Sequence, residues 1–191
     1  QDRRFDRFKG RVMFPIHSLS GRAIGFGGRL LRSNVKAAKY LNSPESLIYQ
    51  KSRVLYGLFQ AKKSIVRNDK CFLVEGYTDV VSLSQHGIEN VVSSSGTALT
   101  IEQIRLIKRL TKNVTLIFDG DTAGLKASFR GIDLLLEEEM SVRIVPLKES
   151  QDPDSLAKEQ KESTINYLND KEQDFIQFKL DSLIKDADND P

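Results

Sequence analysis

Two short apolar segments that each end in acidic residues place the strongest constraint on the fold of this chain. Cys71–Val74 is followed directly by Glu75, and Val114–Phe118 is followed by Asp119 and Asp121. Helical patterns separate the predicted strands from one another, which indicates βαβ units and a parallel sheet. Because the carboxyl ends of parallel strands lie at one edge of the sheet, where α/β proteins bind their ligands, we expect these acidic residues to meet there.

The residues before these strands predict a β-hairpin and a helix. Arg11–Ile16 and Arg22–Leu31 have the composition of strands on either side of a turn, whereas residues 36–45 show no clear period. Apolar residues at helical spacing predict a helix over Ser52–Val66. Interior glycines of the second strand indicate a close approach of another group, such as a nucleic-acid backbone.

From Lys70 onward the sequence predicts helices and strands in alternation, followed by helices alone. The predicted helices cover Thr78–His86, Thr100–Leu110 and Ala123–Glu139, and the further strands cover Asn90–Val92 and Val142–Pro146. Thr100 and Gln103 form a capping box at the start of the second of these helices. Residues 154–185 predict polar amphipathic helices.

The charged residues are unevenly distributed along the 191-residue chain. Residues 1–70 hold 16 Lys or Arg and 4 Asp or Glu, whereas residues 71–191 hold 13 and 22. A basic part can hold a phosphate backbone and an acidic cluster can hold a divalent cation, although two solvated surfaces would give the same count. No apolar run is long enough to span a membrane. The single cysteine, Cys71, excludes an internal disulfide framework and a multi-cysteine zinc site, and fits a reducing cytoplasm.

A second acidic pair, Asp152 and Asp154, follows the predicted strand Val142–Pro146. Like charges gathered at one edge repel unless something neutralises them, and Mg²⁺ prefers oxygen ligands. A metal site of this kind suits phosphoryl or nucleotidyl transfer. Each acidic motif alone has a simpler interpretation: a turn at residues 119–121, a strand-end cap at Glu75, and a helix N-cap at Asp154.

Several motifs resemble known families. Val-Glu-Gly-Tyr-Thr-Asp-Val-Val at 74–81 and Asp-Gly-Asp-Thr-Ala-Gly at 119–124 resemble the two halves of the Toprim domain, which topoisomerases, bacterial primases, nucleases and recombination proteins share. The catalytic core of bacterial DnaG-type primases is similar to this chain in the motifs at residues 11–16, 24–29, 39–45, 51–58 and 152–154. The resemblance covers roughly residues 5–160.

The resemblance implies a role for each matching acidic residue. Glu75 corresponds to the glutamate that acts as metal ligand or general base, and Asp119 and Asp121 correspond to the metal-binding aspartates, so these three would be catalytic. The implied cofactor is Mg²⁺ or Mn²⁺, and zinc would bind only to a domain that is absent from this chain. The complete set of implied metal-binding residues is Glu75, Asp79, Asp119, Asp121, Asp152 and Asp154.

The resemblance also implies how substrates bind. The phosphates of the incoming nucleotide would be held by Lys39, Asn42 and Lys51, and the template strand by Arg22, Arg29 and Arg32. The function implied is that of a primase, a nucleotidyltransferase that makes short RNA primers from ribonucleoside triphosphates on single-stranded DNA. We expect a cytoplasmic bacterial monomer without membrane contact, which meets the replicative helicase through a region outside this chain.

The implied architecture is α/β and has three parts. Residues 1–69 would form part of a basic α+β subdomain, residues 70–150 a Toprim domain with a parallel sheet flanked by helices, and residues 151–191 an acidic loop and C-terminal helices. Two rival hypotheses stay open. The first is another Toprim enzyme: a nuclease would cut DNA with Mn²⁺ and no nucleotides, whereas a topoisomerase would need a partner tyrosine domain that we do not expect in this chain. The second is a non-catalytic Toprim module, which would bind DNA even after the acidic residues are removed.

Overall fold

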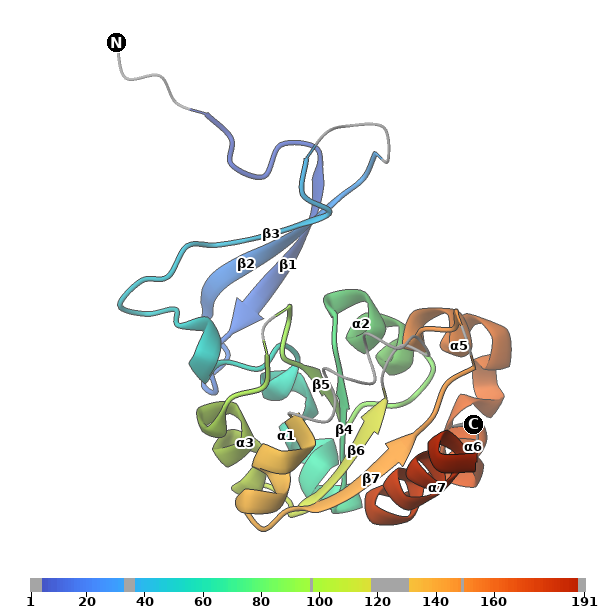
Figure 1. Ribbon diagram of the computed structural model, residues 1–191. Coiled ribbons are helices and arrows are strands. Elements are labelled where there is room, and N and C mark those ends of the chain that lie inside the picture. The colour runs from blue at the N-terminus through green and yellow to red at the C-terminus, as the bar shows by residue number, and fades with distance from the viewer. Residues whose placement is uncertain (1–4, 33–36, 97, 118–130, 149, 189–191) are drawn as a thin grey trace.

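The computed structural model of the protein describes residues 5–32, 37–96, 98–117, 131–148 and 150–188, with the backbone alone at 181–183 and 185–188. A three-stranded antiparallel sheet lies above a larger α/β body (Figure 1). Within the described ranges, no helix combines the length and the apolar character that crossing a membrane requires.

The α/β body is built on a five-stranded sheet with the strand order β5-β4-β6-β7-β8. Its strands are β4 (Cys71–Val74), β5 (Val91–Ser93), β6 (Asn113–Ile117), β7 (Ser141–Val145) and β8 (Gln173–Asp174). The first four pair in parallel, and β8 adds an antiparallel edge to β7. The predicted α/β fold with a parallel sheet is therefore confirmed.

Helices cover both faces of this sheet, which explains why the central strand β4 is apolar and buried along its whole length. One face packs against α1 (Leu58–Asn68), α3 (Ile101–Lys108) and the helical residues 131–137. The other face packs against α2 (Tyr77–Gln85), α5 (Pro153–Gln160) and α6 (Thr164–Lys171). Neighbouring side chains of β4 divide between the two cores: Leu73 is buried in the first and Phe72 in the second.

The N-terminal sheet consists of β1 (Arg11–His17), β2 (Ala23–Leu30) and β3 (Tyr40–Asn42). The hairpin of β1 and β2 agrees with the prediction, but β3 lies where no strand was predicted. Its three residues are too few to show a period of two, and they pair with Gly27, Gly28 and Arg29, which lie far away in sequence.

The predicted helix over residues 52–66 is wrong at its start. Lys51–Arg53 form a 3₁₀ turn, and α1 begins only at Leu58 after Gly57, whose φ of 83° is in the left-handed region. The intervening chain is extended, and Tyr56 exchanges backbone hydrogen bonds with Ser93 at 2.9 and 3.1 Å. Leu55 lies in this extended segment and is buried in the core, so the apolar pattern spanned two different structures.

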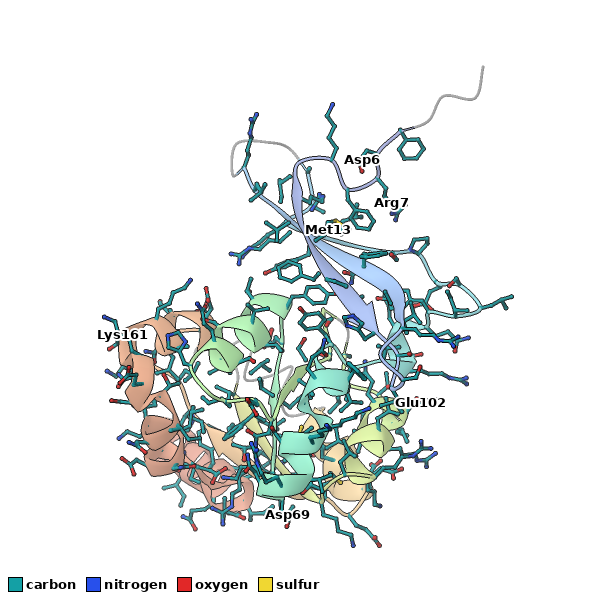
Figure 2. All side chains as sticks on the ribbon, turned by 180° about the vertical axis from the view of Figure 1, so that it is seen from behind. Asp6, Arg7, Met13, Asp69, Glu102 and Lys161 are labelled. Carbon is teal, nitrogen blue, oxygen red and sulfur yellow. The ribbon has the colours of Figure 1, made fainter. Side chains whose placement is uncertain are left out.

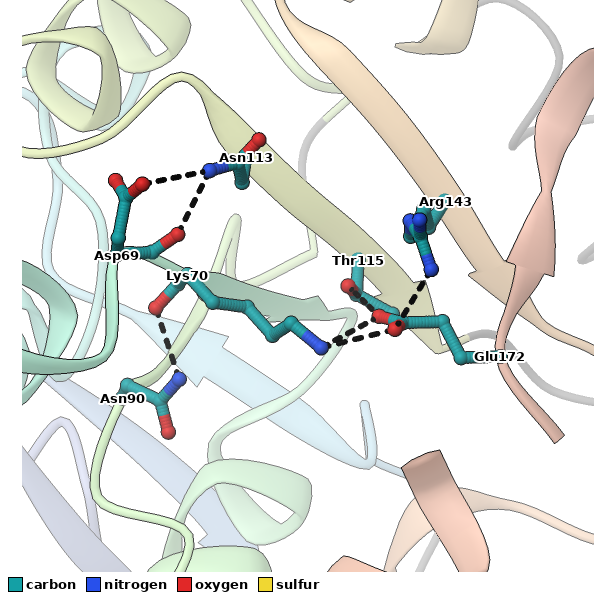
Figure 3. A network of polar contacts seen from close by, with 7 residues as sticks. All are labelled: Asp69, Lys70, Asn90, Asn113, Thr115, Arg143 and Glu172. Atoms are coloured by element: carbon teal, nitrogen blue, oxygen red, sulfur yellow. Dashed lines mark hydrogen bonds and ion pairs between the residues drawn. The ribbon is translucent and has the colours of Figure 1, made fainter. Parts of the chain in front are cut away.

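A polar network attaches the C-terminal segment to the sheet (Figure 3). The Glu172 carboxylate, whose side chain is 7% exposed, accepts hydrogen bonds from Lys70 at 2.9 and 3.0 Å and from the Thr115 hydroxyl, and lies 3.4 Å from Arg143. Burial acts to raise the pKa of Glu172, but the bonds from Thr115 and Lys70 outweigh it and hold that pKa below its ordinary value. One carboxylate thus ties β8 to β4, β6 and β7.

The two ends of the parallel strands face different surroundings. Asp69, just before β4, lies at the end of the molecule remote from Met13 of the N-terminal hairpin (Figure 2). Strands β6 and β7 run away from the end that holds Asp69, and their arrows point toward α2 and the N-terminal sheet (Figure 1). The carboxyl edge of the sheet therefore meets the basic hairpin, and the candidate site lies at this junction.

Candidate metal-binding and nucleotide-binding site

A cavity of about 370 Å³ lies where the N-terminal sheet meets the carboxyl edge of the α/β body. The acidic residues that line it come from the α/β body: Glu75, Asp79, Asp152 and Asp154. The basic and amide side chains come from the N-terminal sheet and the segment before β3: Arg29, Lys39 and Asn42. We call this space the acidic cavity. It brings together residues of opposite charge from two sheets that are far apart in sequence.

Glu75 follows β4 directly and lines the acidic cavity with a half-buried side chain. Its backbone carbonyl accepts a hydrogen bond from the Ser95 N–H at 3.1 Å. Ser95 and Gly96 both have positive φ angles, 60° and 80°, so the chain after β5 turns sharply toward Glu75. A serine in the left-handed region is strained, and such strain is found most often at functional sites.

Asp79 is 8% exposed and caps the helix that begins beside Glu75. Its Oδ2 accepts a hydrogen bond from the Gly76 N–H at 2.9 Å. A carboxylate in the first turn of a helix also interacts favourably with the helix dipole. Asp79 therefore fixes the start of α2 and, with it, the position of Glu75.

Asp152 and Asp154 lie at the start of α5. The predicted N-cap at Asp154 is wrong: the N-cap is Asp152, whose Oδ1 accepts from the Ser155 N–H at 2.7 Å. Pro153 takes the first helical position, where its missing N–H costs nothing. Asp154 contacts Lys158 instead, with Oδ2 2.6 Å from Nζ. Burial acts to raise the pKa of Asp154, but hydrogen bonds from Lys158 and Ser82 hold that pKa below its ordinary value.

The donor set of this cavity fits a hard divalent cation. Four carboxylates line it, and Mg²⁺ takes oxygen ligands, of which typically one or two are carboxylates and the rest waters or phosphates. Among the described residues, no group of three or more His, Cys, Asp or Glu lies close enough together to hold a metal ion by itself. Asp119 and Asp121 lie outside the described residues, so their predicted position beside Glu75 stays a prediction.

The opposite wall of the acidic cavity is cationic and aromatic. The Arg29 guanidinium and the Lys39 ammonium lie 5.8 and 5.9 Å from the centroid of the Tyr40 ring. The ring holds both cations beside the cavity through its negative face. The Tyr40 hydroxyl lies 3.2 Å from that of Thr78 on α2. Two positive charges facing four carboxylates suit a ligand that carries both phosphates and a cation.

The comparisons with known proteins agree with this geometry. Residues 1–62 match the family described as the DNA primase catalytic core, N-terminal domain, and residues 72–157 match the Toprim-like family. The chain belongs to the catalytic-core family of DnaG-type DNA primases. Membership implies metal dependence in general terms, without naming the ion.

Relatives and solved structures support this assignment. The chain is 42% identical over 185 residues to the DNA primase of Legionella pneumophila and 39% identical over 191 residues to that of Escherichia coli K12. These matches cover 95% and 98% of this chain but 32% of each relative, so the chain spans about a third of their length.

Two solved structures have the same fold over nearly the whole chain. A DNA primase domain from Pseudomonas aeruginosa aligns with a TM-score of 0.87 at 39% identity, covering 96% of this chain and 58% of that one. The Aquifex aeolicus primase structure, with zinc-binding and RNA polymerase domains, gives 0.87 at 38% identity, covering 96% and 45%.

Three of the predicted substrate-binding residues lie outside the lining of the acidic cavity of this primase core. Lys51 is in the 3₁₀ turn, where its N–H donates to Glu45 at 3.0 Å. Arg22 is exposed in the hairpin turn, and Arg32 is exposed just after β2. The structure therefore groups Arg29, predicted to bind the template, with Lys39 and not with the other two arginines.

No role was predicted for Tyr77, which connects the two halves of the site. Tyr77 is 2% exposed, stacks on Phe14 with centroids 5.2 Å apart, and donates a hydrogen bond to Asn42 Oδ1 at 2.8 Å. Burial raises the pKa of Tyr77 to about 12. The Asn42 amide in turn lies 3.4 Å from the Ser95 carbonyl. Asn42, predicted to contact phosphate, thus bridges β3 to the residues beside Glu75.

The interior glycines of β2 turn out to accommodate aromatic rings. A Cβ on Gly27 would lie 2.5 Å from the Tyr77 ring, and one on Gly25 would lie 3.0 Å from Tyr49. The close approach predicted at these positions exists, but the group that approaches is an aromatic side chain of the protein, not a nucleic-acid backbone. A glycine inside a strand, here Gly27, was the sequence signal that could have led to the contact with Tyr77.

Proposed function

We propose that this chain carries the nucleotidyl-transfer site of a primase, which makes short RNA primers from ribonucleoside triphosphates on single-stranded DNA. The observation that carries the proposal is the acidic cavity, in which Glu75 and three aspartates face Arg29 and Lys39. A metal–nucleoside triphosphate complex carries both charges that these walls would attract.

The residues of the cavity would have different roles in such a reaction. Glu75, with Asp119 and Asp121, would hold Mg²⁺ or Mn²⁺, and Asp79, Asp152 and Asp154 would complete the acidic wall. Bound metal lowers the pKa of the attacking primer hydroxyl and stabilises charge on the transferred phosphate. Lys39 and Arg29 would orient the triphosphate so that the 3′-hydroxyl reaches the α-phosphate and pyrophosphate leaves.

The template would lie on the basic surface of the N-terminal sheet. Arg22 and Arg32 are exposed there, outside the acidic cavity, where they can neutralise phosphates without reading bases. A structure titled as a DnaG primase catalytic domain bound to single-stranded DNA aligns with this chain at a TM-score of 0.86 and 39% identity, covering 97% of this chain and 59% of that one. We extend DNA binding to this chain on that similarity.

The setting of the reaction is part of the same proposal. The protein would act as a monomer in the bacterial cytoplasm and would meet the replicative helicase through a region that this chain does not include. A Toprim nuclease is the alternative that a simple assay separates, because it would cut DNA in Mn²⁺ without any nucleoside triphosphate.

Primer synthesis tests the proposal directly. The chain is grafted in place of the matching segment of the Escherichia coli DNA primase, and labelled ribonucleotides are supplied with a single-stranded template. We expect primers from the wild-type graft, none from Glu75→Gln, and normal synthesis from Glu102→Gln. Glu102 is the matched control because it is exposed on α3 (Figure 2). Full synthesis by Glu75→Gln, or DNA cleavage without nucleotides, would contradict the proposal.

A further inference from the structure

Asp154 stands between two hollows of the surface. One is the acidic cavity, and the other is an adjoining groove of about 530 Å³ that runs between the N-terminal hairpin, α2 and α5. Among the described residues, the two hollows share Arg29, Thr78 and Asp154, whereas Lys158 lines the groove and not the acidic cavity. A carboxylate in this position can face either hollow by a rotation of its side chain.

The Asp154 carboxylate is held by Lys158 on the groove side. Lys158 lies one helical turn further along α5, and its Nζ is 2.6 Å from Asp154 Oδ2. The Asp154 side chain is 20% exposed and that of Lys158 is 66% exposed. An ion pair with one such exposed partner is weak, because water screens it and the lysine loses side-chain entropy. Lys158 can therefore release Asp154 at little cost.

We propose that Lys158 competes with the divalent cation of the acidic cavity for Asp154 and so weakens metal binding there. This inference rests on the proposed metal site. An ammonium group and a metal ion that approach the same carboxylate repel each other, and each is favoured by the same negative charge. Binding of metal would draw Asp154 toward the acidic cavity and leave Lys158 exposed in the groove.

The sign of the effect separates this proposal from its main rival. If Lys158 merely orients Asp154 for the metal, its removal weakens metal binding. If Lys158 competes, its removal strengthens metal binding, by about two- to fivefold for a pair this exposed. The strengthening also has to depend on Asp154, because a general change of surface charge would act without it.

Mn²⁺ alone is the probe, titrated into the protein at low ionic strength and followed by electron paramagnetic resonance of the free ion. We expect Lys158→Met to bind Mn²⁺ about two- to fivefold more tightly than the wild type, and Lys158→Arg to restore the wild-type affinity. Lys161→Met is the matched control, because Lys161 is exposed at the end of the same helix (Figure 2) and makes no ion pair with the described residues. Asp154→Asn should abolish the gain from Lys158→Met.

The outcomes distinguish this inference from the proposed function. Equal or weaker Mn²⁺ binding by Lys158→Met, or an equal gain from Lys161→Met, overturns the competition while the metal site stands. A gain that persists in the Asp154→Asn background overturns it as well. A wild-type protein that binds no Mn²⁺ contradicts the metal site and the inference together. Circular dichroism of each variant verifies that the fold is retained.

Discussion

Removing the Tyr77 hydroxyl should loosen the junction that forms the candidate site. Tyr77 donates its hydrogen bond to Asn42 Oδ1 at 2.8 Å in a partly buried setting, and Tyr77→Phe removes this bond without removing the ring. A typical intramolecular hydrogen bond contributes about 1 kcal/mol to stability. For a chain of this size, a loss of about 1 kcal/mol corresponds to a fall in Tm of about 2–4 °C.

A double-mutant cycle isolates this contact from other effects of the substitutions. Tyr77→Phe, Asn42→Ala and the double variant are unfolded in urea, and the three free energies of unfolding are compared with that of the wild type. We expect a coupling energy of about 1 kcal/mol, because either single change already breaks the bond. Tyr77→Ala should cost about 3–5 kcal/mol, since it also removes the ring that stacks on Phe14. Strictly additive effects of Tyr77→Phe and Asn42→Ala would refute the role given to this bond.

Three further perturbations test other parts of the structure. Glu172→Gln should lower the free energy of unfolding by about 1–3 kcal/mol at neutral pH. The pKa of Glu172 in the folded state is lowered from its ordinary value of 4.5, so the stabilisation from its charge is present above pH 4.5 and is lost as the pH falls through the folded-state pKa. Urea unfolding of the variant should therefore depend less on acid pH than that of the wild type. Gly27→Ala should lower the free energy of unfolding by about 1–3 kcal/mol, because the added Cβ forces Tyr77 aside. Gly131→Ala is the control and should be neutral or stabilising, because its Cβ would make an ordinary contact. Similar thermal melts for the two variants would contradict the packing argument. Lys39→Met should weaken the binding of a fluorescent GTP analogue about three- to tenfold, while the same change at the exposed Lys112 should have no effect.

The sequence predicted the sheet edge well, because the pattern that defines it is local. The apolar run of β4 ends at Glu75, so the strand end and the acidic residue could be located together. The position of Asp152 at the same edge followed from the next strand pattern. Proline favours the first helical position, so Pro153 indicates that the preceding residue, Asp152, is the N-cap. The prediction chose Asp154 instead and was wrong.

The parts that sequence reasoning missed depend on contacts between distant residues. β3 is defined by pairing with Gly27, Gly28 and Arg29, and its three residues carry no period of their own. The bridge from Asn42 through Tyr77 joins residues 35 positions apart. Neither the secondary-structure propensity of a residue nor the hydrophobic periodicity of the sequence indicates which aromatic ring packs against a glycine. Only the docking of the hairpin on α2 reveals these contacts.

The proposed chemistry depends on a divalent cation that the acidic cavity holds beside Glu75. The most direct measurement is an anomalous difference map from a crystal of this chain soaked in saturating Mn²⁺. We expect a strong peak within coordination distance of the Glu75 carboxylate, on the side of the cavity that faces Lys39, and its loss in Glu75→Gln. An empty cavity after saturating soaks, or a peak that persists unchanged in Glu75→Gln, would contradict it.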